Sequence, residues 1–368
     1  RALVSGRPYR LDTLLLYYAN PCYAWMNPER WTHALDAVPF IATCTPFMDE
    51  TATAVADLIL PDHTYLERWE DAAPAPSSGA PVFGIRQPVV APLHDTRASG
   101  DVVIEIAKKL GGRCAEAFPW KDFRSALLAR AVGIQAARRG SINETSPKKF
   151  FRRLVKQGFW SDPEYPFEAW SEAFETPTRK FEFFSLRLWH TLQGFAEQAG
   201  RSPAQVVAGW NHEEDPDLVC MPRHTALAWA GTEAEYPLLL DPYRRGTYAV
   251  GGGANLPLLQ DLVTEHGGSR WETTAALHPS SAEPLGIRDG DRIAVESPAG
   301  RVEVPVHVDI GVRPGTLHFP QGGGHTAFGR FAKGRGANVM ELLVPAFDPL
   351  AGFAALTGTR VRARRIPS

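Results

Sequence analysis

The chain has 368 residues, of which 44% are hydrophobic and 22% are charged, a composition typical of a globular protein with two or three packed domains. Its 39 basic and 41 acidic residues leave a formal charge of -2, which excludes a general electrostatic attraction to nucleic acid or anionic lipid. No apolar run approaches the ~18 residues that a membrane-spanning helix needs. Any membrane connection is therefore expected to come through a partner.

Residues 1–112 alternate strand and helix patterns. The apolar run 13–18 predicts a buried parallel strand, and 28–35 predicts a helix with Asn27 as its N-cap. Further strands are expected at 39–43 and 57–60, a short helix at 50–56, and a helix at 100–110. This alternation is typical of a Rossmann-like α/β unit, which binds ligands at the carboxyl ends of its parallel strands.

Residues 113–232 predict a mostly helical connecting region. The segments 123–132 and 150–155 are amphipathic, and four of the tryptophans of this region are expected to serve packing (Trp160, Trp170, Trp189 and Trp210). The chain begins at Arg1 rather than Met and enters its first strand at Thr13, so we expect an upstream portion to be missing. The four cysteines have no metal-binding spacing and are expected to be reduced thiols (Cys22, Cys44, Cys114 and Cys220).

Residues 233–368 change to short strands separated by Gly and Pro turns. Strands are predicted at 292–297, 300–308 and 315–319, a pattern of a compact β-barrel domain. Two glycine runs interrupt this part, Gly251–Gly253 and Gly322–Gly324. Glycines let backbone N–H groups approach a diphosphate or a flat polar ligand closely, and they also allow tight turns without any ligand.

Polar side chains accompany these runs. Asn20 follows the first strand, where its amide can face a ligand at the sheet edge or simply form an Asn-Pro turn. His325 follows the second glycine run and could donate to a ligand oxygen, although a lone His is more often structural. Asn338, upstream of Asp348-Pro349, offers an amide suited to a heterocycle edge.

These segments, in this order, resemble the molybdopterin oxidoreductases of the dimethyl sulfoxide reductase superfamily. The resemblance rests on the strand end at Asn20, the Glu50-Thr51-Ala52 turn, Leu60-Pro61 and the run Leu66-Glu67-Arg68. It extends through residues 174–183, which match a strand of that family, to the segments 282–291 and 322–329. The segments 282–291 and 322–329 resemble its C-terminal cofactor-binding domain.

The resemblance implies a fold in three parts: a Rossmann-like dinucleotide-binding portion at 1–112, a helical region at 113–232, and a six-stranded β-barrel of the double-psi type at 233–368. It implies that the chain binds bis(molybdopterin guanine dinucleotide) carrying molybdenum or tungsten. The cofactor-binding residues implied are Asn20, Thr45, Arg68, Asp101, Arg244, Gly251, Gly252, Gly253, Asn255, Gly323, Gly324, His325, Asn338 and Thr357. No catalytic residue and no metal ligand is assigned in this chain.

Two further positions, Asp101 and Arg244, carry an alternative or a departure from the family pattern. Asp101 resembles the acid that faces guanine in the family, yet an acid at the start of a helix also complements the helix dipole. Arg244 matches the Arg of a family Thr-Gly-Arg, but Asp241, Pro242 and Tyr243 replace its neighbours. A carboxylate at position 241 would repel a phosphate, which counts against tight dinucleotide binding.

The resemblance covers only the C-terminal portion of a complete family member. The iron–sulfur cluster and the metal-ligating side chain are expected in the missing N-terminal region, so this segment alone is not expected to be active. The stretches 57–66 and 326–338 resemble complex iron–sulfur molybdoenzymes, which implies anaerobic respiration at the periplasmic face of a membrane, with an iron–sulfur subunit and a quinone-interacting subunit as partners. The alternative is a cofactor-free structural subunit of a respiratory quinone complex.

Overall fold

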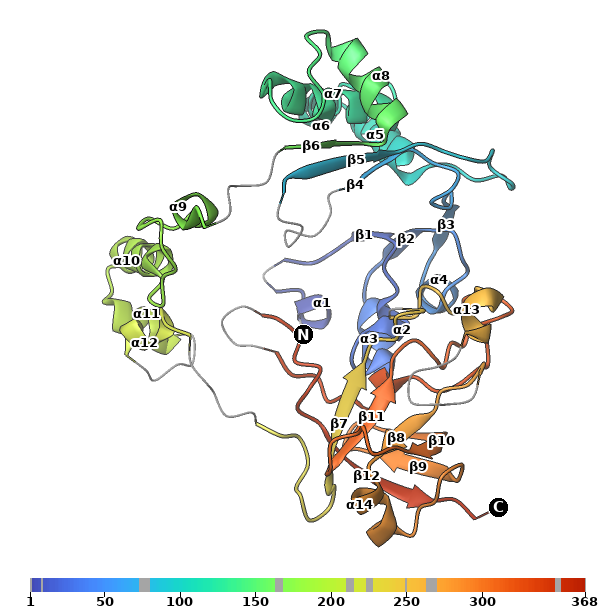
Figure 1. Ribbon diagram of the computed structural model, residues 1–368. Helices are drawn as coiled ribbons and strands as arrows, with labels where there is room; N and C mark the ends of the chain where they lie inside the picture. The colour runs from blue at the N-terminus through green and yellow to red at the C-terminus, as the bar shows by residue number, and fades with distance from the viewer. Residues whose placement is uncertain are drawn as a thin grey trace. The chain divides into compact units, whose positions relative to one another are not determined.

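The computed structural model of the chain describes residues 2–7, 9–72, 80–162, 168–209, 215–222, 228–248, 250–262, 270–347 and 352–367 (Figure 1). The chain divides into two compact units, one made of Arg1–Leu60 with Thr225–Ser368 and the other of Pro61–His224. The first unit thus joins two segments that are far apart in sequence. Asp348-Pro349 and Trp210 lie outside the described residues.

The N-terminal segment of the first unit is a small parallel α/β arrangement. Its helices and strands are α1 (Ala2–Ser5), β1 (Thr13–Tyr17), α2 (Pro21–Ala24), α3 (Pro28–Leu35), β2 (Phe40–Thr45), α4 (Glu50–Ala54) and β3 (Leu58–Pro61). The strands form a sheet in the order β1-β2-β3, with β1 parallel to β2 and Thr13 opposite Phe40. The predicted α/β alternation and the Asn27 cap, whose side chain accepts from the Arg30 N–H, are confirmed.

The prediction that the first strand is buried is wrong for this unit. Along β1 exposed and half-buried residues alternate, and Leu15 and Tyr17 are 41% and 54% exposed. The physical reason is position, since β1 is an edge strand of the three-stranded sheet. Its inward residues, Leu14 and Leu16, pack against a small core around Leu35 and Ile41 (the N-terminal core).

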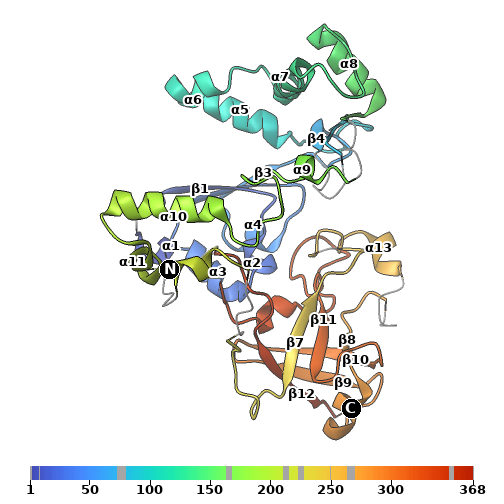
Figure 2. The same cartoon turned by 60° about the vertical axis from the view of Figure 1, so that its left-hand side comes forward.

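The C-terminal segment of the first unit is a closed six-stranded barrel, as predicted. Its elements are β7 (Leu238–Tyr243), α13 (Pro257–Asp261), β8 (Ala275–Leu277), α14 (Pro279–Ala282), η3 (Glu283–Leu285), β9 (Arg292–Glu296), β10 (Arg301–Val308), β11 (Thr316–Pro320), η4 (Val339–Leu342) and β12 (Arg360–Arg365). The strand order is β10-β8-β11-β7-β12-β9, and β7–β11 and β8–β10 are the parallel pairs (Figure 2).

Alternation along the strands builds the barrel core. In β10 the residues Val302, Val304 and Val306 point inward between exposed or half-buried neighbours. They join the fully buried Leu277, Ile293, Leu317 and Phe319 from the other strands. Because β7 and β11 are parallel neighbours, with Pro320 opposite Tyr243, the loops after both strands leave the barrel at the same end.

The second unit consists mainly of helices. Its elements are β4 (Glu70–Ala72), β5 (Val82–Arg86), α5 (Ser99–Leu110), α6 (Gly112–Ala117), α7 (Phe123–Ala136), α8 (Pro147–Gln157), β6 (Phe159–Ser161), α9 (Trp170–Ala173), α10 (Leu186–Ala199), α11 (Pro203–Gly209) and α12 (Pro216–Val219). Helices α7 and α8 pack with the antiparallel sheet β4-β5-β6 around Leu127, Phe150 and Leu154.

The strand expected within 174–183 is not present, and the segment forms turns instead. Arg179 adopts a left-handed backbone with φ of 55°. The Thr176 hydroxyl donates to the Lys180 carbonyl, and the Thr178 hydroxyl donates to Glu182. Local side-chain bonds of this kind compete with strand pairing and favour a turn.

Candidate functional site

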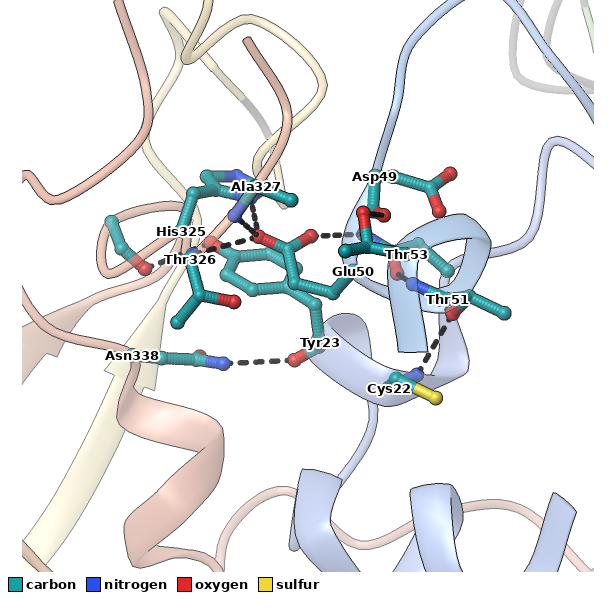
Figure 3. A network of polar contacts seen from close by, with 12 residues as sticks. Cys22, Tyr23, Asp49, Glu50, Thr51, Thr53, His325, Thr326, Ala327 and Asn338 are labelled. Carbon is teal, nitrogen blue, oxygen red and sulfur yellow. Dashed lines mark hydrogen bonds and ion pairs between the residues drawn. The ribbon is translucent and has the colours of Figure 1, made fainter. Parts of the chain in front are cut away.

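A buried carboxylate joins the two segments of the first unit. Glu50 is the first residue of α4, whose N-cap Asp49 accepts a bond from the Ala52 N–H at 2.7 Å. Glu50 Oε1 accepts from His325 Nδ1 at 3.0 Å and from the backbone N–H groups of Thr326 and Ala327 at 2.9 Å each (Figure 3). We call Glu50 and the groups that donate to it the Glu50 network.

The other carboxylate oxygen is held from the end of β1. Glu50 Oε2 accepts from Asn20 Nδ2 at 2.7 Å, and Asn20 Oδ1 accepts from the Thr51 hydroxyl at 2.8 Å. Burial alone would raise the pKa of Glu50, but the bonds from His325, Ala327 and Asn20 outweigh it and lower the pKa to about 2. Glu50 is therefore an ionised carboxylate at neutral pH, although it is only 6% exposed.

Three rings stack beside this carboxylate. The His325 ring lies 3.7 Å from the Tyr23 ring and 4.7 Å from the Phe328 ring, with both pairs nearly parallel. The Tyr23 hydroxyl donates to the Gly323 carbonyl at 2.9 Å. Burial, and secondly the charge of Glu50, raise the pKa of Tyr23, so this hydroxyl keeps its proton.

The stacked histidine has one ring nitrogen without a partner among the described residues. His325 is 2% exposed, and its Nε2 is buried without a hydrogen bond. Gly251, with φ of 121°, packs on this nitrogen, since a Cβ at that position would lie 2.9 Å from Nε2. Since Glu50 holds Nδ1–H, Nε2 is the nitrogen that faces the first glycine run.

The two glycine runs allow close packing of protein on protein. A Cβ at Gly323 would overlap the Thr273 hydroxyl, and one at Gly324 would overlap the Asn338 backbone N–H. A Cβ at Gly253 would lie 2.8 Å from the Thr247 carbonyl oxygen. Gly252 differs, because no heavy atom lies within 4 Å of the corresponding Cβ position among the described residues. The backbone at Gly252 is thus the exposed face of this turn.

The structure brings several of the sequence-predicted residues together in the first unit. Asn20 and His325 bond with Glu50, and two glycines of the second run, Gly323 and Gly324, lie beside Tyr23. Asn338 Nδ2 donates to the Tyr23 carbonyl at 2.9 Å, and its Oδ1 accepts from the Met340 N–H at the start of η4. At 4% exposure, Asn338 joins the barrel to α2.

Other predicted residues have separate local roles. The Thr45 hydroxyl donates to the Phe47 carbonyl at 3.0 Å, where β2 ends. Asn255 Oδ1 accepts from the Phe331 N–H at 3.0 Å, which connects the loops after β7 and β11. Thr357 is exposed in a bend before β12.

Arg244 is exposed immediately after β7, whereas its neighbour Arg245 is 5% exposed. Arg245 donates to the Tyr248 hydroxyl at 3.1 Å and to the Glu272 carbonyl at 3.2 Å. Its Nε is buried without a partner among the described residues. Buried and half-buried side chains alternate along β7, and the same alternation would bury the side chain at position 244. The strand ends at Tyr243, however, and the alternation ends with it.

Asp241, the residue expected to repel a phosphate, is paired. Its carboxylate lies 3.1 Å from His318 Nε2 across the parallel strands β7 and β11. The two side chains are 43% and 20% exposed. When His318 is protonated, this contact offsets the negative charge of Asp241.

Arg68 and Asp101 belong to the second unit. Arg68 Nη1 contacts Asp62 at 2.5 Å and the His63 carbonyl at 3.2 Å, and Nη2 pairs with Glu70. Asp101 Oδ1 accepts from the Phe123 N–H at 2.7 Å, which connects the starts of α5 and α7. Both side chains thus have intramolecular roles in their own unit.

Sequence reasoning did not assign Glu50, Tyr23 or Arg245 as site residues. Glu50 is part of the Glu50-Thr51-Ala52 turn on which the family resemblance rests. It was not assigned a role because an acid in the first turn of a helix ordinarily complements the helix dipole. Within the described residues, no group of three His, Cys, Asp or Glu side chains could hold a metal ion. No helix among the same described residues has the length and apolarity needed to span a bilayer.

Comparison with known proteins agrees with this architecture. Residues 263–360, which include most of the barrel, match the family model described as the Molydopterin dinucleotide binding domain. The chain is 30% identical over 98% of its length to the arsenate respiratory reductase molybdopterin-containing subunit of Shewanella sp. (strain ANA-3). It is 28% identical over 98% of its length to a menaquinone reductase, molybdopterin-binding-like subunit, of Nitratidesulfovibrio vulgaris.

The chain spans 45% and 42% of the lengths of these two relatives. Among solved structures it is similar to acetylene hydratase from Pelobacter acetylenicus, with a TM-score of 0.68, 22% identity, and coverage of 99% of this chain and 46% of that one. This likeness concerns the fold. The chain thus carries a molydopterin dinucleotide binding domain, and nearly its whole length is similar to molybdopterin subunits of other proteins.

Proposed function

We propose that this chain is the C-terminal part of a molybdopterin-dependent oxidoreductase subunit that binds bis(molybdopterin guanine dinucleotide) and works in respiratory electron transfer. The observation that carries the proposal is the end of the barrel where β7 and β11 finish. Arg245 Nε and Gln321 Oε1, one after each strand, are buried there without a partner among the described residues. Exposed Arg244 and the open backbone at Gly252 belong to the same loop after β7.

The two arginines fit a negatively charged group, whereas Gln321 Oε1 fits a hydrogen-bond donor. Arg244 would attract a diphosphate, and the Gly252 backbone would allow close approach of a flat ring. The Glu50 network would hold the second glycine run in place, because it fixes the segment that follows Gly324. When bound, the metal cofactor supplies the redox chemistry, and the protein binds and orients it.

The names of the relatives support a respiratory role. One relative is a respiratory reductase subunit and another is a menaquinone reductase subunit. We infer that the complete protein works with an iron–sulfur subunit and a quinone-interacting membrane subunit. Four of the predicted residues would act on the cofactor indirectly, because most of their hydrogen bonds and packing contacts are made within the protein (Asn20, Gly324, His325 and Asn338).

A second candidate is a cofactor-free structural subunit of a quinone-linked complex. Two observations favour it, the tight packing of protein on Gly251 and Gly323, and a carboxylate, Asp241, on the strand that leads to Arg244. One relative is also named a molybdopterin-binding-like subunit. The two candidates differ in whether the complete protein contains the cofactor.

Metal analysis and pterin fluorescence on the complete protein, purified with its partners, test the proposal. We expect one molybdenum or tungsten and two pterins per chain. Arg244→Ala should weaken cofactor retention about tenfold, because a charge-assisted bond contributes about 1.5–3 kcal/mol. Arg313→Ala is the matched control, since Arg313 is exposed before β11, at the opposite end of the barrel. A folded complex without metal and pterin would favour the structural subunit.

A further inference from the structure

Helix α8 carries an unbalanced cationic face. Five of its 11 residues are Lys or Arg and none is acidic. Its apolar residues Phe150, Phe151 and Leu154 are buried against α7 and the β4-β5-β6 sheet. The cations are consequently on the outside, and all five are exposed (Lys148, Lys149, Arg152, Arg153 and Lys156).

This face is costly for the isolated helix. Lys149, Arg152 or Arg153, and Lys156 repeat at spacings of three and four, which brings like charges together and costs about 0.2–0.5 kcal/mol per pair. Lys148 and Lys149 also lie in the first turn, where the helix dipole disfavours positive charge. Glu144 pairs with Arg153 at 3.4 Å, and no other carboxylate of the described residues lies within pairing distance of these five cations.

Helix α5 of the same unit shows the ordinary solution. There Glu105 lies between Arg97 and Lys109 and pairs with both, at 2.5 and 3.3 Å. Alternating charge of this kind stabilises a solvent-exposed helix. Helix α8 contains no carboxylate, so the positive charge of its exposed face is not balanced in the same way. This imbalance favours contact with a negatively charged partner.

Two grooves flank the cationic face. One, of about 620 Å³, is lined by Glu144, Lys149, Arg152, Arg153, Lys156 and Gln157. The other, of about 350 Å³, combines the cations Arg124, Lys148 and Arg152 with an apolar floor of Leu128, Phe151 and Val155. Arg152 lines both, so the grooves meet at this side chain. The surface is therefore hollowed and partly apolar.

We propose that this face of α7 and α8 binds an acidic segment of a partner protein. Carboxylates at helical spacing would match the stripe from Lys149 to Lys156, which is about 10 Å long at 1.5 Å per residue. An apolar side chain of the same segment would enter the groove above Leu128 and Phe151. The proposal is independent of cofactor binding.

The shape and the chemistry favour a polypeptide over a phosphate surface. A bilayer is flat and would not fill two grooves, whereas side chains of a peptide can. The chain's overall charge of -2 leaves the attraction local to this face.

The test measures binding of a fluorescent acidic peptide to the complete protein by anisotropy, at low and at high ionic strength. The peptide carries Glu at alternating spacings of three and four and a Leu between them; a second peptide has the same composition in scrambled order. The triple variant Lys149→Glu, Arg152→Glu, Lys156→Glu should bind the ordered peptide at least about tenfold more weakly. The matched control is Lys108→Glu, Arg113→Glu, Lys121→Glu, which makes the same charge change on exposed positions of the same unit.

We expect the control variant to keep wild-type affinity and the scrambled peptide to bind more weakly than the ordered one. Equal loss in both triple variants, or equal affinity for both peptides, would overturn the proposal. So would tighter binding to phosphatidylserine vesicles than to the ordered peptide. If the Glu variant has a lowered melting temperature, the Gln variant at the same three positions replaces it in the same comparison.

Discussion

Two histidine–carboxylate pairs of nearly the same length lie in different surroundings of the first unit. His325 and Glu50 are 3.0 Å apart and almost fully buried, whereas His318 and Asp241 are 3.1 Å apart on the half-exposed outside of β7 and β11. Glu50 accepts three further bonds, two of them from backbone N–H groups. The comparison teaches that burial and the number of hydrogen-bond donors, not the distance, determine how much the loss of such a pair lowers the free energy of unfolding.

The largest expected effect comes from removing the buried carboxylate. Glu50→Ala leaves His325 Nδ1 and the Thr326 and Ala327 N–H groups buried without an acceptor. We expect a loss of about 3–5 kcal/mol in the free energy of unfolding, measured by urea denaturation. If Glu50→Ala lowered the free energy of unfolding by less than about 1 kcal/mol, the effect expected for the exposed His318–Asp241 pair, the two pairs would not differ as described.

The pH dependence of stability should follow the same carboxylate. The folded pKa of Glu50 is lowered from 4.5 to about 2, so its contribution is complete above pH 4.5 and is lost as the pH falls toward 2. In urea denaturation between pH 7 and pH 2, the free energy of unfolding should fall more steeply with decreasing pH for the wild type than for Glu50→Gln, whose side chain cannot titrate. Parallel curves would show that Glu50 has an ordinary pKa in the folded protein.

A moderate effect is expected at Asn338, which bonds with the Tyr23 carbonyl and the Met340 N–H. Asn338→Ala should lower the free energy of unfolding by about 2 kcal/mol, because both backbone partners remain buried. Asn338→Asp keeps an acceptor for Met340 and loses the donor to Tyr23, so it separates the two bonds. A thermal melt of each variant measures the difference, and an unchanged melting temperature for both would refute a joining role.

The smallest effect belongs to the exposed pair. Asp241→Ala should change the free energy of unfolding by less than about 1 kcal/mol, since an exposed ion pair contributes little. In the complete protein, the same change should improve cofactor retention if a negative charge beside Arg244 opposes a diphosphate. Weaker retention would instead indicate that Asp241 supports the loop, and pterin fluorescence distinguishes the two results.

Much of the first unit was predictable because its signals are local. Asn27 caps α3 as expected, and the alternation of Val302, Val304 and Val306 placed a barrel strand correctly. The segment 174–183 was predicted to be a strand, but it forms turns. Local side-chain bonds, such as the one from the Thr178 hydroxyl to Glu182, compete with strand pairing, and the sequence pattern does not reveal them. The predicted cofactor contacts of Asn20, His325 and Asn338 stay predictions, while the structure adds an intramolecular role for each.

The sequence alone determined the order of elements, the glycine runs and the resemblance to the molybdopterin oxidoreductases, since each is written in neighbouring residues. Only the tertiary structure decided that Glu50 meets His325, 275 positions further along the chain. It also decided that Arg245 is inside and Arg244 outside. Contacts of this range depend on how the sheet and the barrel pack together, and packing is a property of the folded surfaces, which no local pattern of residues specifies.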